Sequence, residues 1–359
     1  MTARTTGYLL NGVLVLVLAL FLWLMEQYLD GYKIQILNLI AVNIILALSL
    51  NLIYGFTGMF SLGHAGFMAV GAYVCAMLVL PPEQKEMLFI LEPPLWPFSV
   101  MQLPFFAAVL AGGLTAALFG FLMGFPVLRL GGDYLGIATL GFAEIIRVLA
   151  TNLPRVTNGA LGLKGIPLYA NLWWNYGWCL ITLYCIVRLV RSNFGNALTA
   201  IRDDEKAAQA MGIDVFKYKM ISFTIGAFFA GIGGALLGNL LTTIDPKMFL
   251  FVLTFNVLMI VVTGGLGSIT GTVLAGIVIT ALLEWLRFVE NPVTLWNMTI
   301  PGIPGMRMVV FSLVLIVIIL YRREGIMGMR EFSWTGCRRR LEKLLKRLGL
   351  RPEPKGAAR

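Results

Sequence analysis

The sequence predicts an all-α membrane protein, a polytopic bundle of about ten transmembrane helices. Of its 359 residues, 58% are apolar and only 13% are charged, whereas roughly a quarter of the residues of a soluble domain carry a charge. The mean hydropathy is +0.84. Because one bilayer crossing takes about 20 apolar residues, the chain has room for many crossings and little mass outside the membrane. A large soluble catalytic domain is therefore excluded.

Ten apolar stretches, separated by charged residues, Pro or Gly, locate the predicted helices in chain order. They lie near residues 8–25, 34–53, 63–80, 104–125, 134–150, 174–190, 219–241, 248–264, 271–288 and 305–321. We assign residues 1–330 to a transmembrane domain and residues 331–359 to a basic tail.

The distribution of positive charge predicts the orientation. The net charge is +10, and residues 322–359 alone contain twelve Lys and Arg against four Glu. An even number of spans places both termini on one side, and cationic segments stay in the cytoplasm. With the tail inside, the cytoplasmic segments hold twenty cations and the outer loops hold five. We expect both termini to be cytoplasmic.

In the tail itself, apolar residues are spaced among cations. This predicts either a helix lying on anionic membrane lipid or a disordered segment attracted to the same surface. No nucleic-acid partner is expected, because the tail is already held at the membrane. The two outer loops, 81–103 and 151–172, are rich in Pro or Gly. Each is either a surface for an external partner or a solvated connector.

The longest internal cytoplasmic segment, 192–218, contains a short predicted helix. Asp203 can cap its N-terminus, while Asp204 and Glu205 suit the positive end of the helix dipole. Gly212 can supply a left-handed stop.

The exposed face of this short helix is predicted to be small and apolar, formed by Ala207, Ala208 and Met211. Such a face suits docking into a groove on another protein better than catalysis. The alternative is a solvated linker helix, and the composition leaves both open.

Two glycine-rich breaks interrupt the apolar stretches, and both lie toward the cytoplasm in this topology. Irregular backbone at membrane depth occurs only where it lines protein or water, so these residues either line a pathway or allow close helix packing, and we favour packing. The candidates are Gly55, Gly58, Ser61, Gly63 and His64 in the first break, and Gly264, Gly265, Gly267 and Ser268 in the second. The helix that starts after Ser61 could also attract a carboxylate, and His64 could gate or bond to backbone.

Two intramembrane charge pairs have a spacing of three, Glu144 with Arg147 and Glu284 with Arg287. This spacing places each pair on one helix face. Each pair either neutralises itself, which is the simpler interpretation, or holds the charges of a solute.

Metal, cofactor and nucleotide sites are not expected in this chain. The four cysteines form no C-x-x-C pair and His64 is the single histidine, which excludes thiolate and multi-histidine metal centres. No lysine is followed by Ser or Thr, so a phosphate-binding Walker A loop cannot form. No cluster of acid, base and nucleophile is present either, and we predict no catalytic residue.

The segment Glu205-Lys206-Ala207-Ala208 followed by Gly212 resembles the coupling loop of ATP-binding-cassette importer permeases, with one residue inserted between Glu and the Ala pair. This inserted residue and several other segments resemble the branched-chain amino acid permease family. Within that family, they resemble the LivM branch more than its LivH partner. Those segments are 51–58, 61–65, 130–135, 139–142, 144–147, 202–205 and 264–268. Gly131 departs from the family, which usually has an arginine there.

The resemblance covers residues 34–330 and implies a non-catalytic permease subunit in a prokaryotic inner membrane. It implies a second, LivH-like permease, two ATPase subunits that carry the ATP and Mg, and a periplasmic or surface binding protein for Leu, Ile or Val. A related importer for urea or short amides remains open. From other classes, so do a proton-coupled secondary transporter and, less favoured, a membrane-embedded enzyme.

Overall fold

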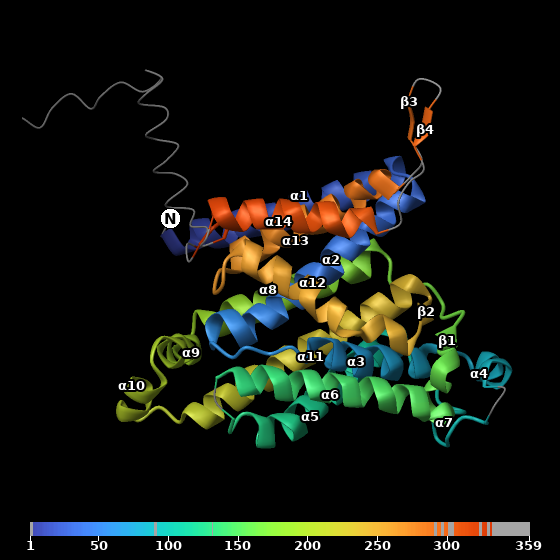
Figure 1. Ribbon diagram of the computed structural model, residues 1–359, viewed down its shortest axis with the longest axis horizontal. Helices are drawn as coiled ribbons and strands as arrows, with labels where there is room; N and C mark the ends of the chain where they lie inside the picture. Colours follow the sequence, from blue (N-terminus) through green and yellow to red (C-terminus); the bar gives the residue numbers. More distant parts are fainter. Residues whose placement is uncertain are drawn as a thin grey trace, which may run out of the picture.

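The computed structural model describes residues 3–89, 92–130, 132–290, 293–295, 298–300, 305–322, 325–328 and 331. The basic tail from residue 332 onward lies outside the described residues, so its predicted lipid-surface helix stays a prediction. The described chain is predominantly helical, as the sequence predicts (Figure 1).

The described helices, in chain order, are α1 Ala3–Tyr28, α2 Gly31–Asn51, α3 His64–Val79, α4 Pro82–Leu88, α5 Phe105–Val127, α6 Asp133–Asn152, α7 Pro154–Thr157, α8 Leu172–Val190, α9 Asn193–Asp203, α10 Glu205–Ala210, α11 Val215–Leu241, α12 Phe251–Gly264, α13 Ile269–Trp285 and α14 Met306–Tyr321. Shorter helical turns are η1 Leu52–Phe56, which is π-helical, and the 3₁₀ turns η2 Gly159–Leu161, η3 Pro246–Phe249 and η4 Leu286–Glu290. Two small antiparallel ribbons pair β1 Leu163–Lys164 with β2 Thr243–Ile244, and β3 Val293–Leu295 with β4 Met298–Ile300.

Each of the ten predicted spans coincides with a helix to within a few residues. Among the described residues, four helices are long and apolar enough to cross a membrane alone: Gly31–Phe56, Phe105–Val127, Tyr134–Asn152 and Val215–Leu241. A fifth is obtained if α3 and α4, which meet at a bend of 118°, count as one span. The count of ten spans therefore stays a prediction. Helix α12, with 14 residues, spans only about 21 Å at 1.5 Å per residue.

The core lies where α11 packs against α3 and α5. Glycines meet there: a Cβ on Gly71 of α3 would overlap the backbone of Gly231 in α11, and one on Gly112 of α5 would lie 2.7 Å from the Gly71 carbonyl oxygen. Helix α2 is apolar on all sides and buried along most of its length, as expected of a helix surrounded by others. At the glycines, the crossings of α3 with α11 and with α5 bring the helix backbones into direct contact.

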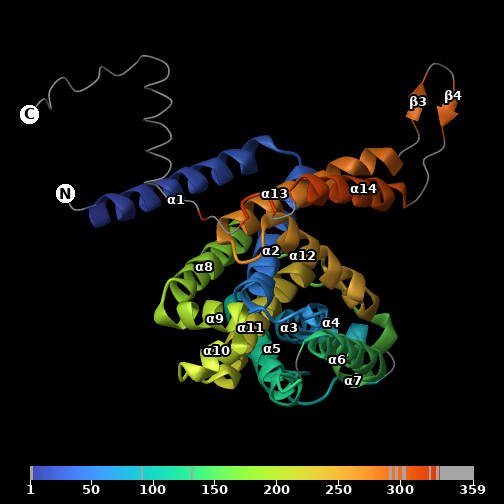
Figure 2. The ribbon, with the colours of Figure 1, turned by 60° about the vertical axis from the view of Figure 1, so that its left-hand side comes forward.

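The two ends of the bundle carry different segments. Figure 1 places α9 and α10 at one end and α4, α7, β1 and β2 at the other, and Figure 2 shows α1 and α14 on the side of the bundle opposite α5. The loops predicted to lie outside thus share one end, and the longest internal segment lies at the other.

The outer loops are tied to each other and to the bundle. Lys85 in α4 is fully buried, and its Nζ donates to the carbonyl oxygens of Phe98 (2.8 Å) and Met101 (2.7 Å). The Leu95 amide donates to the Arg155 carbonyl at 3.1 Å, and Arg155 pairs with Glu92 at 2.6 Å. The segments 81–103 and 151–172 therefore pack together as one structured surface.

Candidate functional site

The predicted short helix forms as α10, but Asp204 is its N-terminal cap. The Asp204 carboxylate accepts hydrogen bonds from the amides of Lys206 (2.9 Å) and Ala207 (3.0 Å). The prediction that Asp203 provides the cap is wrong, because α9 extends through Asp203 and leaves Asp204 in the extended conformation that a cap requires. Gly212 has φ of +83°, as expected of a left-handed helix stop.

The exposed face of α10 is narrower than predicted. Met211 is 83% exposed, whereas Ala208 is 4% exposed and packs with Ile201 of α9 and Val215 of α11. Ala207 is exposed. The three-residue apolar stripe is therefore wrong at Ala208, whose methyl group holds α10 against its neighbours. Ala207 and Met211 are the apolar side chains that remain available to a partner.

An ion pair also ties helix α10 to the bundle. Lys219, in the first turns of α11, pairs with Glu205 at 2.6 Å, and the Lys219 side chain is 16% exposed. The expectation that Glu205 suits the helix N-terminus is compatible with this pairing, since Glu205 is the first residue of α10.

The two glycine-rich breaks, far apart in sequence, face each other. Asn51, fully buried at the end of α2, donates to the Ser268 carbonyl (3.0 Å) and to the Thr272 hydroxyl (2.8 Å), and it accepts from the Gly267 amide (3.0 Å). A Cβ on Gly55 would overlap the Asn51 side chain and the Gly267 amide. The geometry thus favours close packing at Gly55 and Gly267.

The two ends of the second break contact each other, and the segment after α14 covers the break. A Cβ on Gly264 would lie 2.7 Å from the Gly271 backbone, and the Ser268 hydroxyl accepts from the Gly271 amide at 3.0 Å. A Cβ on Gly325, beyond α14, would lie 2.6 Å from the Gly265 amide nitrogen.

That cover continues along the same short segment. The Ile326 amide donates to the Thr263 carbonyl (2.8 Å), and the Glu331 carboxylate accepts from the amides of Ile269 (2.5 Å) and Thr270 (3.3 Å). Ile326 thus bonds to the end of α12 and Glu331 bonds to the start of α13, contacts that sequence patterns do not indicate.

The first turn of α3 is held by threonines from two other helices. The Leu62 amide donates to the Thr139 hydroxyl of α6, and the Ala65 amide donates to the Thr254 hydroxyl of α12, both at 2.9 Å. A Cβ on Gly63 would lie 2.7 Å from the Thr139 carbonyl oxygen. These hydroxyls already occupy amides that a bound carboxylate would need.

His64 and Ser61 are both buried at this helix start. The Ser49 hydroxyl lies 2.8 Å from His64 Nε2 and 2.7 Å from the Leu46 carbonyl oxygen. Because the hydroxyl has one hydrogen, which the carbonyl takes, Nε2 donates to Ser49. Within the described chain, His64 Nδ1 and Ser61 Oγ have no hydrogen-bond partner.

Replacing Thr254 with valine tests whether its hydrogen bond to the Ala65 amide stabilises the start of α3. Valine keeps the shape but removes the acceptor for the Ala65 amide, and leaving a buried amide unsatisfied costs about 1–3 kcal/mol. We expect a lower thermal unfolding temperature of the purified chain in detergent. Thr224→Val is the control, because the Thr224 hydroxyl donates only to the Met220 carbonyl four residues before it. Equal stability losses in the two variants would contradict a stabilising role for the Thr254–Ala65 hydrogen bond.

The two predicted charge pairs differ in the distance between their charged atoms. Arg147 Nε and Glu144 Oε2 are 2.7 Å apart, with side chains 28% and 40% exposed. Arg287 and Glu284 are 4.0 Å apart, and Glu284 also accepts from the Tyr32 hydroxyl at 3.0 Å. Tyr32, 252 positions away, could not be paired with Glu284 from the sequence.

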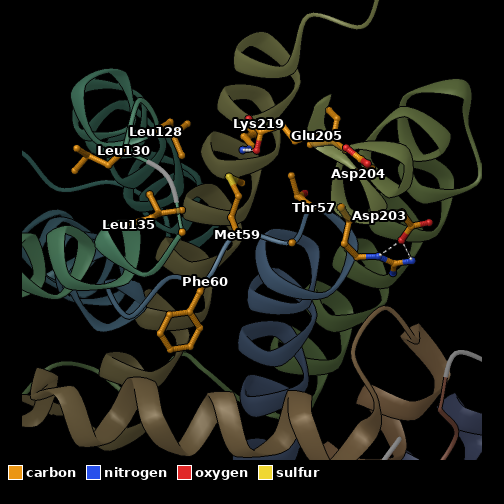
Figure 3. A pocket seen from close by; sticks show the side chains of 14 residues that line it. Thr57, Met59, Phe60, Leu128, Leu130, Leu135, Asp203, Asp204, Glu205 and Lys219 are labelled. Carbon is orange, nitrogen blue, oxygen red and sulfur yellow. Dashed lines mark hydrogen bonds and ion pairs between the residues drawn. The ribbon is translucent and has the colours of Figure 1, made fainter. Parts of the chain in front are cut away.

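A cavity of about 330 Å³ lies between part of the α9–α10 segment and the bundle. Figure 3 shows Asp203, Asp204 and Glu205 on one side of it, Leu128, Leu130 and Leu135 on the other, and Thr57 and Met59 between them. Within the part of the chain that the structure describes, no group of three or more His, Cys, Asp or Glu side chains could hold a metal ion.

Comparison with known proteins shows the family to which the chain belongs. The model of the family described as "Branched-chain amino acid transport system / permease component" matches residues 32–319. The chain belongs to this permease family. The match includes α2 through most of α14 and therefore both glycine breaks and the α9–α10 segment. Together with the apolar helices, it identifies a multi-pass membrane protein.

Among curated relatives, the high-affinity branched-chain amino acid transport permease LivM of Escherichia coli (strain K12) is 34% identical over 288 residues, which are 71% of this chain and 63% of that protein. The chain thus matches less than two thirds of that relative's length. The probable LivM of Methanocaldococcus jannaschii is 24% identical, over 79% of this chain and 89% of the relative. LivH of Salmonella typhimurium is 22% identical, over 72% of this chain and 84% of that protein.

Among solved structures, PsaBC from Streptococcus pneumoniae in complex with Fab superposes with a TM-score of 0.42 at 15% identity. The superposition covers 82% of this chain and 93% of that one. A score of this size does not establish a common fold.

Proposed function

We propose that this chain is a permease subunit of an ATP-driven importer for the branched-chain amino acids Leu, Ile and Val. The family match and the branched-chain amino acid transport function of the LivM and LivH relatives support this class. The position of the α9–α10 segment is the observation that supports coupling to separate ATPases. This segment stands at one end of the bundle, away from the loops predicted to lie outside (Figure 1). Met211 and Ala207 are exposed there.

The proposed assembly pairs this chain with a second, LivH-like permease. Two cytoplasmic ATPases bind ATP and Mg, because the sequence has no Walker A loop, and a periplasmic or surface protein delivers the solute. In this assembly the α9–α10 end faces the cytoplasm of a prokaryotic inner membrane, and both termini are cytoplasmic. Closure of the ATPases pushes α10, and the solute pathway through the bundle then opens to the other side of the membrane. The chain itself catalyses no reaction.

Reconstitution in liposomes tests this proposal. The chain alone is compared with the chain co-purified in mild detergent with the ATPases and second permease that accompany it, with the binding protein and labelled leucine supplied. We expect leucine accumulation only with the complete set and ATP.

Three outcomes would redirect the proposal. Accumulation by the chain alone in a proton gradient would identify a secondary transporter. Binding of urea or a short amide, but not leucine, by the binding protein would change the solute. Chemical turnover of the solute by the chain would identify an enzyme.

A further inference from the structure

Arg202 links the α9–α10 segment to both glycine-rich breaks. It lies one residue before the end of α9, and its side chain is 20% exposed. Its Nη1 donates to the Gly55 carbonyl oxygen at 3.1 Å. Its Nε and Nη2 donate to the same Asp203 oxygen at 3.0 and 2.9 Å. The guanidinium is thus fixed on one edge by its neighbour and bonded on the other to the π-helical turn after α2.

The slot around Arg202 exists because two residues lack side chains. A Cβ on Gly58 would lie 3.0 Å from Arg202 Cγ, and one on Gly267 would lie 2.8 Å from Arg202 Nη1. Both glycines have positive φ, +76° and +79°, so neither position accepts another residue without strain. The turn at Gly58 follows α2 and the turn at Gly267 precedes α13. One side chain therefore contacts both breaks.

The two breaks are also bonded to each other. The Asn51 side chain joins the end of α2 to the Gly267 amide and the Ser268 carbonyl. A movement of Arg202 therefore acts on both glycine-rich breaks together. The ion pair from Glu205 to Lys219 leads to α11 and not to the breaks.

We propose that Arg202 is a positioning residue that transmits displacement of the α9–α10 segment to the paired glycine breaks, and so couples ATP-driven movement to solute passage. This inference rests on the function proposed above. A planar guanidinium with several fixed donors suits the role, because it resists rotation, whereas a lysine ammonium is a flexible point charge that cannot keep both sets of bonds. The contacts form a continuous physical path from α9 to both breaks.

The test uses the full reconstituted complex and measures leucine uptake and ATP hydrolysis in the same vesicles. For Arg202→Ala we expect recovery of the complex, ATP hydrolysis within about twofold of wild type, and uptake at least tenfold lower. Arg202→Lys should also lower uptake per ATP hydrolysed. Arg191→Ala, which removes an exposed cation beside α9, should leave that ratio unchanged.

Each outcome separates the alternatives. If uptake and hydrolysis fall in proportion, or if uptake is unchanged, Arg202 does not transmit movement and the inference is overturned. If Arg202→Ala is not recovered, Arg202→Lys, which keeps the charge, decides by the same ratio. If the wild-type complex itself shows no ATP-dependent uptake, the proposed function fails, and this result is distinct from failure at Arg202.

Discussion

Gly71→Ala is expected to remove most folded protein, although it adds a single methyl group. The new Cβ would overlap the backbone of Gly231 at the contact between α3 and α11, and Gly112 of α5 also lies against the Gly71 backbone. Because backbone surrounds the site, the helices must separate. Overpacking typically costs about 1–3 kcal/mol, and here we expect about 4 kcal/mol or more, the range reserved for severe core defects. Thermal unfolding in detergent and the yield of monodisperse protein measure the loss.

Gly141→Ala is the matched control for this substitution. Gly141 also lies within a long helix, α6, but a Cβ there meets nothing within 4 Å. Alanine is a better helix former than glycine by up to about 1 kcal/mol, so the control should be neutral or slightly stabilising. Similar losses at the two positions would show that backbone contact at Gly71 does not control stability.

Met211→Glu is expected to separate the chain from the proposed ATPases without affecting membrane insertion. Met211 is 83% exposed at the end of α10, and an apolar side chain at the centre of an interface commonly contributes about 2 kcal/mol or more to binding. A charge there should lower ATPase association at least about tenfold, which corresponds to 1.4 kcal/mol. Co-purification from detergent and binding titration with isolated ATPase measure the effect.

Met87→Glu provides the control at the opposite end of the bundle. Met87 lies in α4 and is 78% exposed, so the same chemical change is made at a surface that faces away from α10. Retained association in Met211→Glu, or an equal loss in both variants, would contradict docking at α10. Ala208 is unsuitable for this test because it is buried, and a bulky residue there would disturb folding first.

Helix positions follow from the sequence because hydropathy is local. The stretches near 34–53 and 219–241 become α2 and α11 with small shifts, and the spacing of Glu144 and Arg147 predicts their contact. The family resemblance is confirmed over residues 32–319. The choice between Asp203 and Asp204 as cap was not predictable, because either residue can cap and the end of α9 decides between them.

Features that depend on distant contacts could not be predicted. Ala208 is buried by Ile201 and Val215, and nothing in its own segment indicates that. Arg202 bonds to a carbonyl 147 positions away, and Asn51 to a residue 216 positions away. A backbone carbonyl or amide leaves no mark in the sequence, so only the fold shows these partners.

The cover over the second glycine break has a practical consequence for shortening the chain. A truncation placed directly after α14 would discard the Ile326 amide that bonds to Thr263 and the Glu331 carboxylate that holds the start of α13. Removing the cationic extension while keeping the transporter body intact requires a stop codon after residue 331.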